Sequence, residues 1–498
     1  MKRARRSVAL LTLGFALKAV LSLLVYAMPL LGFWVASSLA AYRGGATWLP
    51  LVVGLLAFPI APLAWDAVGE LRRKKRGDTG ERILTFGDRI LLRTFAITFT
   101  LIALLLAARP ELAFVALSTR GDWMLDGRHS ALAENTRRVL FRAAQGLEWL
   151  YELAHENPFA KLVDEQKPEP PELPAPGTNS APQPAPAPSP PTRPADRVPS
   201  PQPAPLPPIA WPAPATLHPA VANMPRDVEQ SFNSVASYLR EREPNPRQRI
   251  KALHDWVSDR IAYDAEALAD NAIPDQSAHA VFSRRKGVCA GYANLLDAMA
   301  KVTGDEVVVV VGDARTNADD VNGVGHAWNA ARLDGRWFLI DATWDAGSVS
   351  GRTFEKDYGT DYLFTPPDVF IINHLPDHEN WQLRDKPLSR GEFMRQPMLK
   401  AGFFARGFRL VQPDRSQVTV GDALEIVLDN PSSQHILASF WPKASDGEER
   451  TRCRVSPGPR ITAHCAFPDG GVFRVMLFAN AEPTGRFEDV ASFEAVRR

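Results

Sequence analysis

A cysteine, a histidine and an aspartate follow one another along the chain in an order that suits nucleophilic catalysis. Cys289 lies in Gly-Val-Cys-Ala-Gly-Tyr-Ala, His326 in Gly-His-Ala-Trp-Asn, and Asp341 in Leu-Ile-Asp-Ala-Thr-Trp-Asp. A thiolate attacks a carbonyl carbon, an imidazole moves the proton, and a carboxylate orients the imidazole. These residue types therefore predict acyl transfer from an amide through a thioester on Cys289.

The histidine and the aspartate are predicted to share one face of a β-hairpin. Between them stands Asp334-Gly335, a strong signal for a two-residue hairpin turn. With that turn, Asp341 faces Trp328 and His326 faces Thr343. His326 and Asp341 are then diagonal neighbours within side-chain reach of each other.

Asp345 competes with Asp341 for the role of orienting carboxylate. It has the same strand parity but lies beyond the residue that faces His326. We therefore expect Asp341 to be the third member of the site.

The cysteine is predicted at the first turn of a helix. The stretch from Cys289 to Val302 is rich in Ala and Leu at helical spacing, and Gly304 is a stop signal. A helix N-terminus and a nearby imidazolium both favour the thiolate form of a cysteine. An inert buried thiol is the alternative for a single cysteine, and the downstream His and Asp argue against it.

An oxyanion formed on the substrate needs preorganised donors. The backbone N–H of Cys289 at the helix start is one candidate. Gln276 is a weaker second candidate, because it is more typical of an ordinary loop residue.

These motifs resemble the transglutaminase-like superfamily, and more closely its kyphoscoliosis-peptidase-like branch. The matching stretches are residues 287–293, 326–329 and 334–347, with further similar stretches at 362–367 and 374–383. The resemblance runs from about Ile250 to Leu383 and implies a papain-like core. It implies Cys289 as the nucleophile, His326 as the base and Asp341 as the orienting carboxylate.

The resemblance is more specific for the fold than for the reaction. Cleavage of a peptide or isopeptide bond is our first expectation, and protein cross-linking by transamidation is the alternative that uses the same triad. An envelope binding or scaffolding protein without turnover is the alternative from another class, because fold alone does not settle function.

Other residues near the motifs have both a functional and a structural interpretation. Trp328, Trp337 and Trp344 could line a substrate groove, but aromatic residues in a sheet are more typical of core. We expect neither a cofactor nor a metal site, because the remaining histidines do not stand at metal-ligand spacing from carboxylates or cysteines: His254, His279, His374 and His378. The Asp-rich stretch 317–322 favours a solvated turn over a calcium loop.

Length and charge limit the remaining possibilities. The chain has 498 residues, 45% of them hydrophobic, which is enough for two or three domains. A net charge of +1 gives no general reason to expect nucleic-acid binding. The expected partners are a protein or peptide substrate and a membrane.

The first 120 residues are predicted to form a membrane anchor with about three transmembrane helices. Its apolar segments are Ser7–Ala36, Trp48–Trp65 and the shorter Thr94–Ala108. The first is too long for a cleaved signal, and basic clusters at residues 2–6 and 72–76 fit the positive-inside rule. This predicts a multi-pass protein of the cytoplasmic membrane, with everything after residue 120 on the extracytoplasmic, periplasmic side.

A helical juxtamembrane segment over 121–166 and a Pro/Ala-rich linker over 167–225 are expected next. From Pro168 to Pro219, 21 of 52 residues are proline, so this stretch cannot bury a core. Polyproline-like or disordered chain is expected, reaching roughly 160 Å if extended. We favour a spacer over a ligand for SH3-type domains.

The two other cysteines predict a disulfide. Cys453 and Cys465 are placed symmetrically about Pro459, as on the two strands of a hairpin. A bridge between them requires an oxidising compartment, which agrees with the predicted topology and leaves Cys289 as the free thiol. Two free thiols that happen to align are the alternative.

The domain plan that follows is α+β, with transmembrane helices before the catalytic core and a β-sandwich after it. Residues 226–398 are expected to form the transglutaminase-like catalytic domain, opened by helices over Val228–Arg242 and Pro246–Ile261. Short alternating apolar runs after 399 predict an immunoglobulin-like β-sandwich over 399–498. We expect the sandwich to bind or pack against an envelope protein partner.

Overall fold

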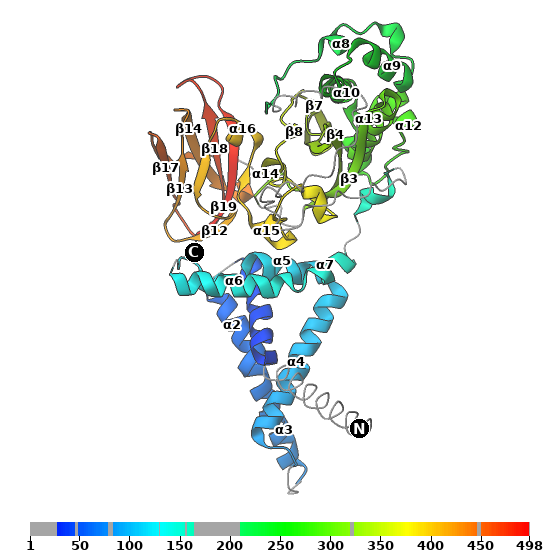
Figure 1. Ribbon diagram of the computed structural model, residues 1–498. Coiled ribbons are helices and arrows are strands. Elements are labelled where there is room, and N and C mark those ends of the chain that lie inside the picture. Colours follow the sequence, from blue (N-terminus) through cyan, green and yellow to red (C-terminus); the bar gives the residue numbers. More distant parts are fainter. Residues whose placement is uncertain are drawn as a thin grey trace, which may run out of the picture. The chain divides into compact units, whose positions relative to one another are not determined.

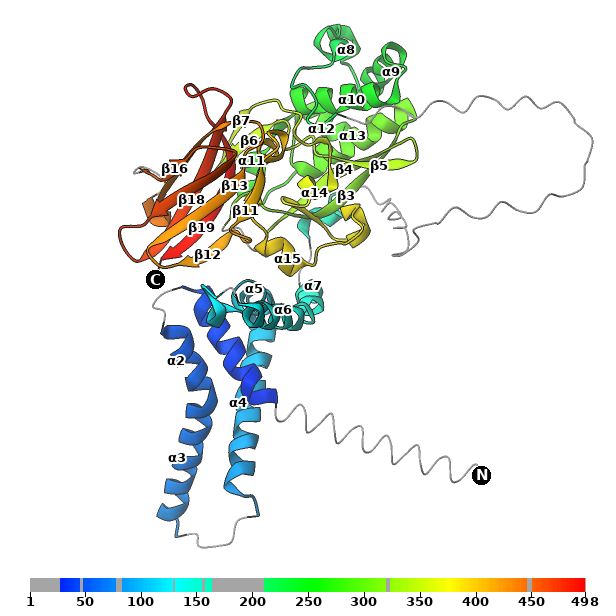
Figure 2. The same ribbon diagram turned by 60° about the vertical axis from the view of Figure 1, so that its left-hand side comes forward.

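The computed structural model describes residues 27–44, 48–77, 83–128, 130–154, 157–163, 210–318, 323–445 and 450–497. It divides into two compact units, drawn in Figures 1 and 2. The first unit comprises Met1–Glu156, Arg315–Gly323 and Ser389–Arg498, and the second comprises Asn157–Ala314 and Val324–Leu388. Most of the predicted linker lies outside the described residues.

The second unit contains a five-stranded antiparallel sheet in the order β8-β5-β4-β3-β9. Its strands are β3 (Glu306–Ala314), β4 (Val324–Leu333), β5 (Arg336–Ile340), β8 (Leu363–Thr365) and β9 (His374–Pro376). Two small pairs of strands accompany it: β1 (Ala262–Tyr263) with β2 (Lys286–Gly287), and β6 (Gly347–Ser350) with β7 (Thr353–Lys356).

The predicted hairpin exists as β4 and β5. Asp334 and Gly335 have φ angles of 50° and 75°, as a two-residue turn with two left-handed residues requires. Asn329 faces Ile340, which is the predicted register. The ladder ends there, so the expected pairings of Asp341 with Trp328 and of His326 with Thr343 do not form. On the other side of β4, His326 faces Gly312 of β3.

Helices and helical turns accompany this sheet in the described part of the unit. They are η3 (Pro158–Lys161), α8 (Pro219–Ala222), η4 (Arg226–Val228), α9 (Phe232–Arg242), α10 (Pro246–Arg260), α11 (Ala265–Ala269), α12 (Ala278–Arg284), α13 (Cys289–Thr303), α14 (Pro367–Phe370) and η5 (Glu379–Gln382). The long helix α13 packs on β3 and β4 and is itself flanked by α9, α10 and α12 (Figure 1). It ends at Gly304, whose φ of +80° suits glycine.

The folded part of this unit begins earlier than the predicted boundary at residue 226. The Trp211 indole donates a hydrogen bond of 3.0 Å to the Asp361 carbonyl oxygen. The His218 backbone N–H donates to Asp255 Oδ2 at 2.7 Å, and Val221 is fully buried in the main apolar core. A composition rich in proline hid these long-range contacts.

The C-terminal part of the first unit is β-rich and forms two sheets. One contains β10 (Met398–Leu399), β12 (Gln417–Val420), β14 (His435–Pro442), β15 (Thr451–Arg452), β18 (Gly471–Asn480) and β19 (Glu488–Arg497). The other contains β11 (Arg409–Gln412), β13 (Ala423–Asp429), β16 (Arg454–Ser456) and β17 (Arg460–Ala466). Two short helices, α15 (Arg390–Arg395) and α16 (Ala401–Ala405), and the turn η6 (Lys443–Ser445) complete this part.

Burial alternates along these strands, as expected for sheets with one covered face. Leu424, Ile426 and Leu428 are buried on β13. Arg454 of β16 faces His464 of β17, so the next position places Cys453 opposite Cys465. The two cysteines are joined by a disulfide with a Cα–Cα distance of 4.4 Å.

The N-terminal part of the first unit is helical. It contains a helix over Ala27–Tyr42, then α2 (Leu49–Leu55), the π-helical turn η1 (Leu56–Ile60), α3 (Ala61–Lys75), α4 (Phe86–Ala108), α5 (Pro110–Arg120), η2 (Trp123–Leu125), α6 (Ala131–Gln145) and α7 (Glu148–Ala154). Within the described residues, one helix is long and apolar enough to cross a membrane, the continuous Leu49–Lys75.

The expectation of about three transmembrane helices is therefore reduced to one candidate. The first predicted segment lies largely on residues outside the described part, and its remainder, Ala27–Tyr42, is a shorter apolar helix. The third predicted segment is the C-terminal part of α4, which begins at Phe86 rather than Thr94. Length and composition alone support one membrane-associated helix.

Candidate active site

His326 and Asp341 lie in direct contact. His326 Nε2 is 2.7 Å from Asp341 Oδ2. The other oxygen, Oδ1, accepts hydrogen bonds from the backbone N–H groups of Thr343 and Trp344 at 2.9 and 3.3 Å. Because Asp341 comes directly after the last residue of β5, its carboxylate turns back toward β4 and is fixed by the loop that follows.

Cys289 occupies the first position of α13 and is the free cysteine of the described residues. The preceding turn is held by Gln276, whose Oε1 accepts the Val288 N–H at 2.9 Å while its Nε2 donates to the Pro274 carbonyl at 2.8 Å. Gln276, weighed as an oxyanion donor, thus braces the turn that presents the thiol.

The helix and the hairpin are tied together next to these residues. Asn329, three positions after His326, donates from Nδ2 to the Ala293 carbonyl of α13 at 3.0 Å. The tie holds the strand with the imidazole against the helix with the thiol. Since Nε2 of His326 is engaged by Asp341, Nδ1 is the ring nitrogen left for another partner.

The electrostatics of His326 follow from these neighbours. Burial favours the neutral ring, but the charges of Asp341 and Cys289 and hydrogen bonds to both raise the pKa of His326 to about 10. Burial likewise favours neutral Asp341, yet His326 and His374 hold the pKa of this carboxyl below its usual range. At neutral pH the site therefore contains an imidazolium beside a carboxylate.

His374 is a site residue that the sequence reasoning missed. Its Nε2 lies 3.0 Å from the same Asp341 Oδ2, and its ring stacks on Phe370 with centroids 4.0 Å apart. Burial lowers the pKa of His374 to about 4, helped by the charge of His326 and opposed by Asp341. It is therefore a neutral donor that fixes the carboxylate without adding charge.

The cluster of His326, Asp341 and His374 also has the composition of a metal site, with ligand atoms within 4.8 Å of one another. Ligands about 2.1 Å from a tetrahedral ion lie about 3.4 Å apart. Here both imidazoles approach one oxygen at 2.7 and 3.0 Å, which is the geometry of one acceptor between two donors. The arrangement fits a hydrogen-bonded site better than a metal site.

Asp345, the competing acid, pairs with a different histidine. His254 Nε2 is 3.0 Å from Asp345 Oδ2, and His254 Nδ1 is 3.1 Å from Asp255 Oδ1. Against the effect of burial, the two carboxylates raise the pKa of His254 to about 9. The sequence places no carboxylate at metal-ligand spacing from His254 or His374, but elements distant in the chain supply carboxylate partners to both.

Tyr263 packs against the same apolar cluster as Cys289, whose backbone N–H is the expected oxyanion donor. Burial, together with the negative charge of Cys289, raises the pKa of Tyr263. Tyr263 was not singled out from the sequence, because it lies in a two-residue strand far from the motifs.

The three tryptophans divide between core and site. Trp328 is buried in a cluster with Trp337 packed against it, as expected for core. Trp344 is partly exposed, and its ring centroid lies 5.7 Å from that of His326 and 4.5 Å from that of His374. Only Trp344 therefore stands beside the imidazoles with a surface open to solvent.

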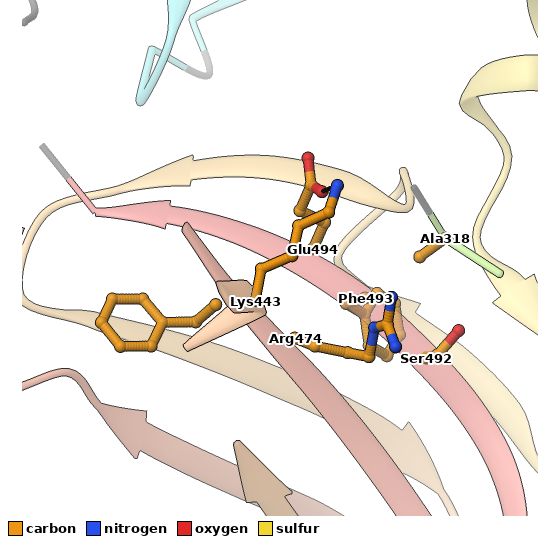
Figure 3. Close-up of a pocket in the computed structure, with 7 residues that line it drawn as sticks. Ala318, Lys443, Arg474, Ser492, Phe493 and Glu494 are labelled. Atoms are coloured by element: carbon orange, nitrogen blue, oxygen red, sulfur yellow. Dashed lines mark hydrogen bonds and ion pairs between the residues drawn. The ribbon is translucent and has the colours of Figure 1, made fainter. Parts of the chain in front are cut away.

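A pocket in the C-terminal β-rich part offers different chemistry. Figure 3 shows Lys443 and Glu494 paired there, at 2.7 Å between Nζ and Oε2, with Arg474 and Ser492 nearby. The lining residues include neither a cysteine nor a histidine. It provides an ion pair but no nucleophile with a base.

Comparison with known proteins finds relatives of a stretch that lies mostly in the second unit. A family model described as the transglutaminase-like superfamily matches residues 233–342. The kyphoscoliosis peptidase of Mus musculus is 31% identical over 211 residues, and that of Homo sapiens is 29% identical over 210 residues. Each match covers 41% of this chain and 32% of the relative, so the chain spans about a third of these proteins.

A solved structure titled "Crystal structure of a TGase" is 24% identical and covers 27% of this chain and 36% of that chain, with a TM-score of 0.20.

Proposed function

Since the chain carries a domain of the transglutaminase-like superfamily, in its kyphoscoliosis-peptidase-like branch, we propose that it is a cysteine peptidase that cleaves amide bonds of proteins or peptides. The main support for this proposal is the contact of His326 with Asp341 at 2.7 Å, with Cys289 at the start of the neighbouring helix. Nucleophile, base and orienting carboxylate each have their partner.

The reaction divides into two halves. The Cys289 sulfur attacks the carbonyl carbon, a C–S bond forms, and the C–N bond breaks as the leaving amine takes the proton of His326. A water molecule then attacks the thioester, gives one proton to His326, and releases a carboxylic acid and the cysteine. Asp341 stays ionised throughout and stabilises the imidazolium.

Hydrolysis is preferred over transamidation because two relatives of this domain are named peptidases. Both reactions share the thioester and differ in whether water or an amine reaches it. The triad geometry does not itself select the acceptor.

Incubation of the full chain with peptides, followed by mass spectrometry, tests the proposal. Cys289-dependent release of a new amine and a new carboxylic acid is expected, and a Cys289→Ala variant should release neither. Incorporation of a small primary amine in preference to hydrolysis would replace the peptidase by a transamidase. Absence of both products in the wild type and in a variant whose site is open to solvent, with a Cys289 that reacts no faster than a free cysteine in that variant, would contradict both.

We further propose that the catalytic domain works outside the cytoplasm on a membrane-associated chain. The support is the apolar helix Leu49–Lys75 and the Cys453–Cys465 disulfide, since such bonds persist in oxidising compartments. Protease protection in sealed vesicles tests this placement. A catalytic domain protected on the cytoplasmic side would contradict it.

A further inference from the structure

The proposed catalytic residues are closed to solvent. Cys289 is 1% exposed, His326 6% and Asp341 0%. A peptide bond must come within about 3–3.5 Å of the sulfur to react. Some part of the chain therefore occupies the space that a substrate needs.

The segment Asn157–Val163, which contains η3, packs into the apolar cluster that contains Cys289. Phe159 is 3% exposed and belongs to the same apolar cluster as Cys289. Leu162 and Val163 pack against this cluster from the same segment. The other buried members of the cluster are small or aliphatic: Val288, Ala290, Ala293, Val309 and Ala327.

The segment is fastened to β3, the strand that pairs with the strand carrying His326. Asn157 Nδ2 donates to the Gly312 carbonyl at 2.5 Å, and Gly312 is the residue that faces His326 across the sheet. Gly325, directly before His326, makes room for the segment. A Cβ there would stand 2.7 Å from Asn157 Oδ1 and 2.8 Å from Pro158 Cδ.

The segment is also fastened to the helix that carries Cys289. Asn294, five positions after the cysteine, donates from Nδ2 to the Leu162 carbonyl at 2.9 Å. A side-chain amide thus binds a main-chain carbonyl, a contact that any extended peptide could make. The segment spans from the strand with the imidazole to the helix with the thiol, as a substrate would.

From this placement we infer that residues 157–163 occupy the substrate groove and keep the enzyme inactive. When the segment leaves, the place of Phe159 becomes the subsite for an apolar side chain of the substrate. The inference rests on the proposed function. The preferred substrate is a peptide with an aromatic or large aliphatic residue, because Phe159 packs with the small and aliphatic side chains of this cluster. The occupant is part of the same chain, so its effective concentration is high.

Latency is tested by the rate at which Cys289 of the full chain reacts with a peptidyl acyloxymethyl ketone that carries Phe. Phe159→Ala should raise this rate at least tenfold. Asn157→Ala, which removes the contact to Gly312, should raise it by a smaller factor. Phe232→Ala is the control, because it removes a ring that packs against the main core of the same unit, away from this cluster.

An unchanged rate in both segment variants, or an equal rise in the Phe232→Ala control, would overturn the inference. The first result would mean that other residues close the site. The second would mean that general loosening of the domain exposes the thiol.

The subsite is tested in the Phe159→Ala variant. A reagent with Phe should react at least tenfold faster than one with Ala or Asp, and a peptide of sequence Glu-Asn-Pro-Phe-Ala-Lys-Leu-Val should inhibit this reaction. The same peptide with Ala in place of Phe should inhibit much less. Equal inhibition by both peptides, or equal rates with all reagents, would contradict the subsite.

These results separate the inference from the proposed function. Fast labelling in Phe159→Ala without turnover would support the covering segment and contradict the peptidase. Turnover in the wild-type chain at the rate of Phe159→Ala would support the peptidase and contradict latency.

Discussion

Asp341 and Asp345 lie four residues apart, and each binds a buried histidine, but the two pairs have different surroundings. His326 stands between Asp341 and the thiol of Cys289. His254 stands between Asp345 and a second carboxylate, Asp255. An imidazolium between a carboxylate and a thiol can pass its proton to a leaving group. An imidazolium between two carboxylates has no leaving group beside it and serves as part of a buried ion pair.

The comparison teaches that the pKa of a histidine does not identify the catalytic one. The pKa is raised to about 10 for His326 and to about 9 for His254. Structural ion pairs shift pKa values as active sites do. What differs is the group on the far side of the ring, and that group decides whether the histidine takes part in chemistry or in stability.

Removal of each histidine gives the largest expected contrast. His326→Ala should lower kcat/KM for peptide cleavage about 10³-fold or more, because no group remains to protonate the leaving amine. His254→Ala should lower it less than tenfold in chain that stays folded. Steady-state kinetics measures both, with circular dichroism as the folding control. Equal losses of kcat/KM would contradict the assignment of catalysis to His326 and of stability to His254.

The two aspartates should separate activity from stability. Asp341→Asn should lower kcat about 100-fold or more, since the imidazolium loses its partner. Asp345→Asn should instead lower the free energy of unfolding by about 3 kcal/mol, because it leaves a buried charge short of one partner. Kinetics and urea unfolding of both variants test this, and an inactive but stable Asp345→Asn would show that the roles are reversed.

His374 should act as a positioning residue with a smaller effect. His374→Phe removes one donor to Asp341, so kcat should fall about tenfold, and the acidic limb of the pH–rate profile should move to higher pH as the carboxyl becomes easier to protonate. His374→Gln, which keeps a donor, should restore part of the rate. A loss of kcat without a shift in the profile would indicate a packing role only.

The pH dependence of the free energy of unfolding should reflect the protonation of His254 beside Asp345. The pKa of His254 is raised from about 6.5 in the unfolded chain to about 9 in the folded one. The stabilisation that protonated His254 gives the folded chain is therefore fully present below pH 6.5 and is lost as the pH rises through 9. Thermal unfolding between pH 6 and 10 should show a smaller decrease in Tm for His254→Gln than for the wild type, and parallel curves would contradict this assignment.

The parts of the site predicted from sequence are those set by local signals. The Asp334-Gly335 turn fixed the register of β4 and β5, and the Ala/Leu pattern with Gly304 placed α13. These two elements bring His326, Asp341 and the cysteine helix together. Their residues are close in the chain or lie on regular elements, where periodicity is informative.

The missed parts depend on long-range contacts. His374 reaches Asp341 from β9, a strand of three residues with no periodic signal. Phe159 reaches the cysteine cluster from the stretch 121–166, for which the sequence predicts a helical juxtamembrane segment. Neither contact leaves a local pattern, because both are decided by packing across the domain.

The most direct test of the central claim is the rate of carbamidomethylation of Cys289 between pH 5 and 9. It should be measured in the wild type, His326→Ala and His254→Ala, and again with Phe159→Ala added so that a covered thiol cannot hide the effect. At pH 7 the rate should fall at least about tenfold in His326→Ala and stay near the wild-type value in His254→Ala. Equal rates in the wild type and His326→Ala would contradict the account.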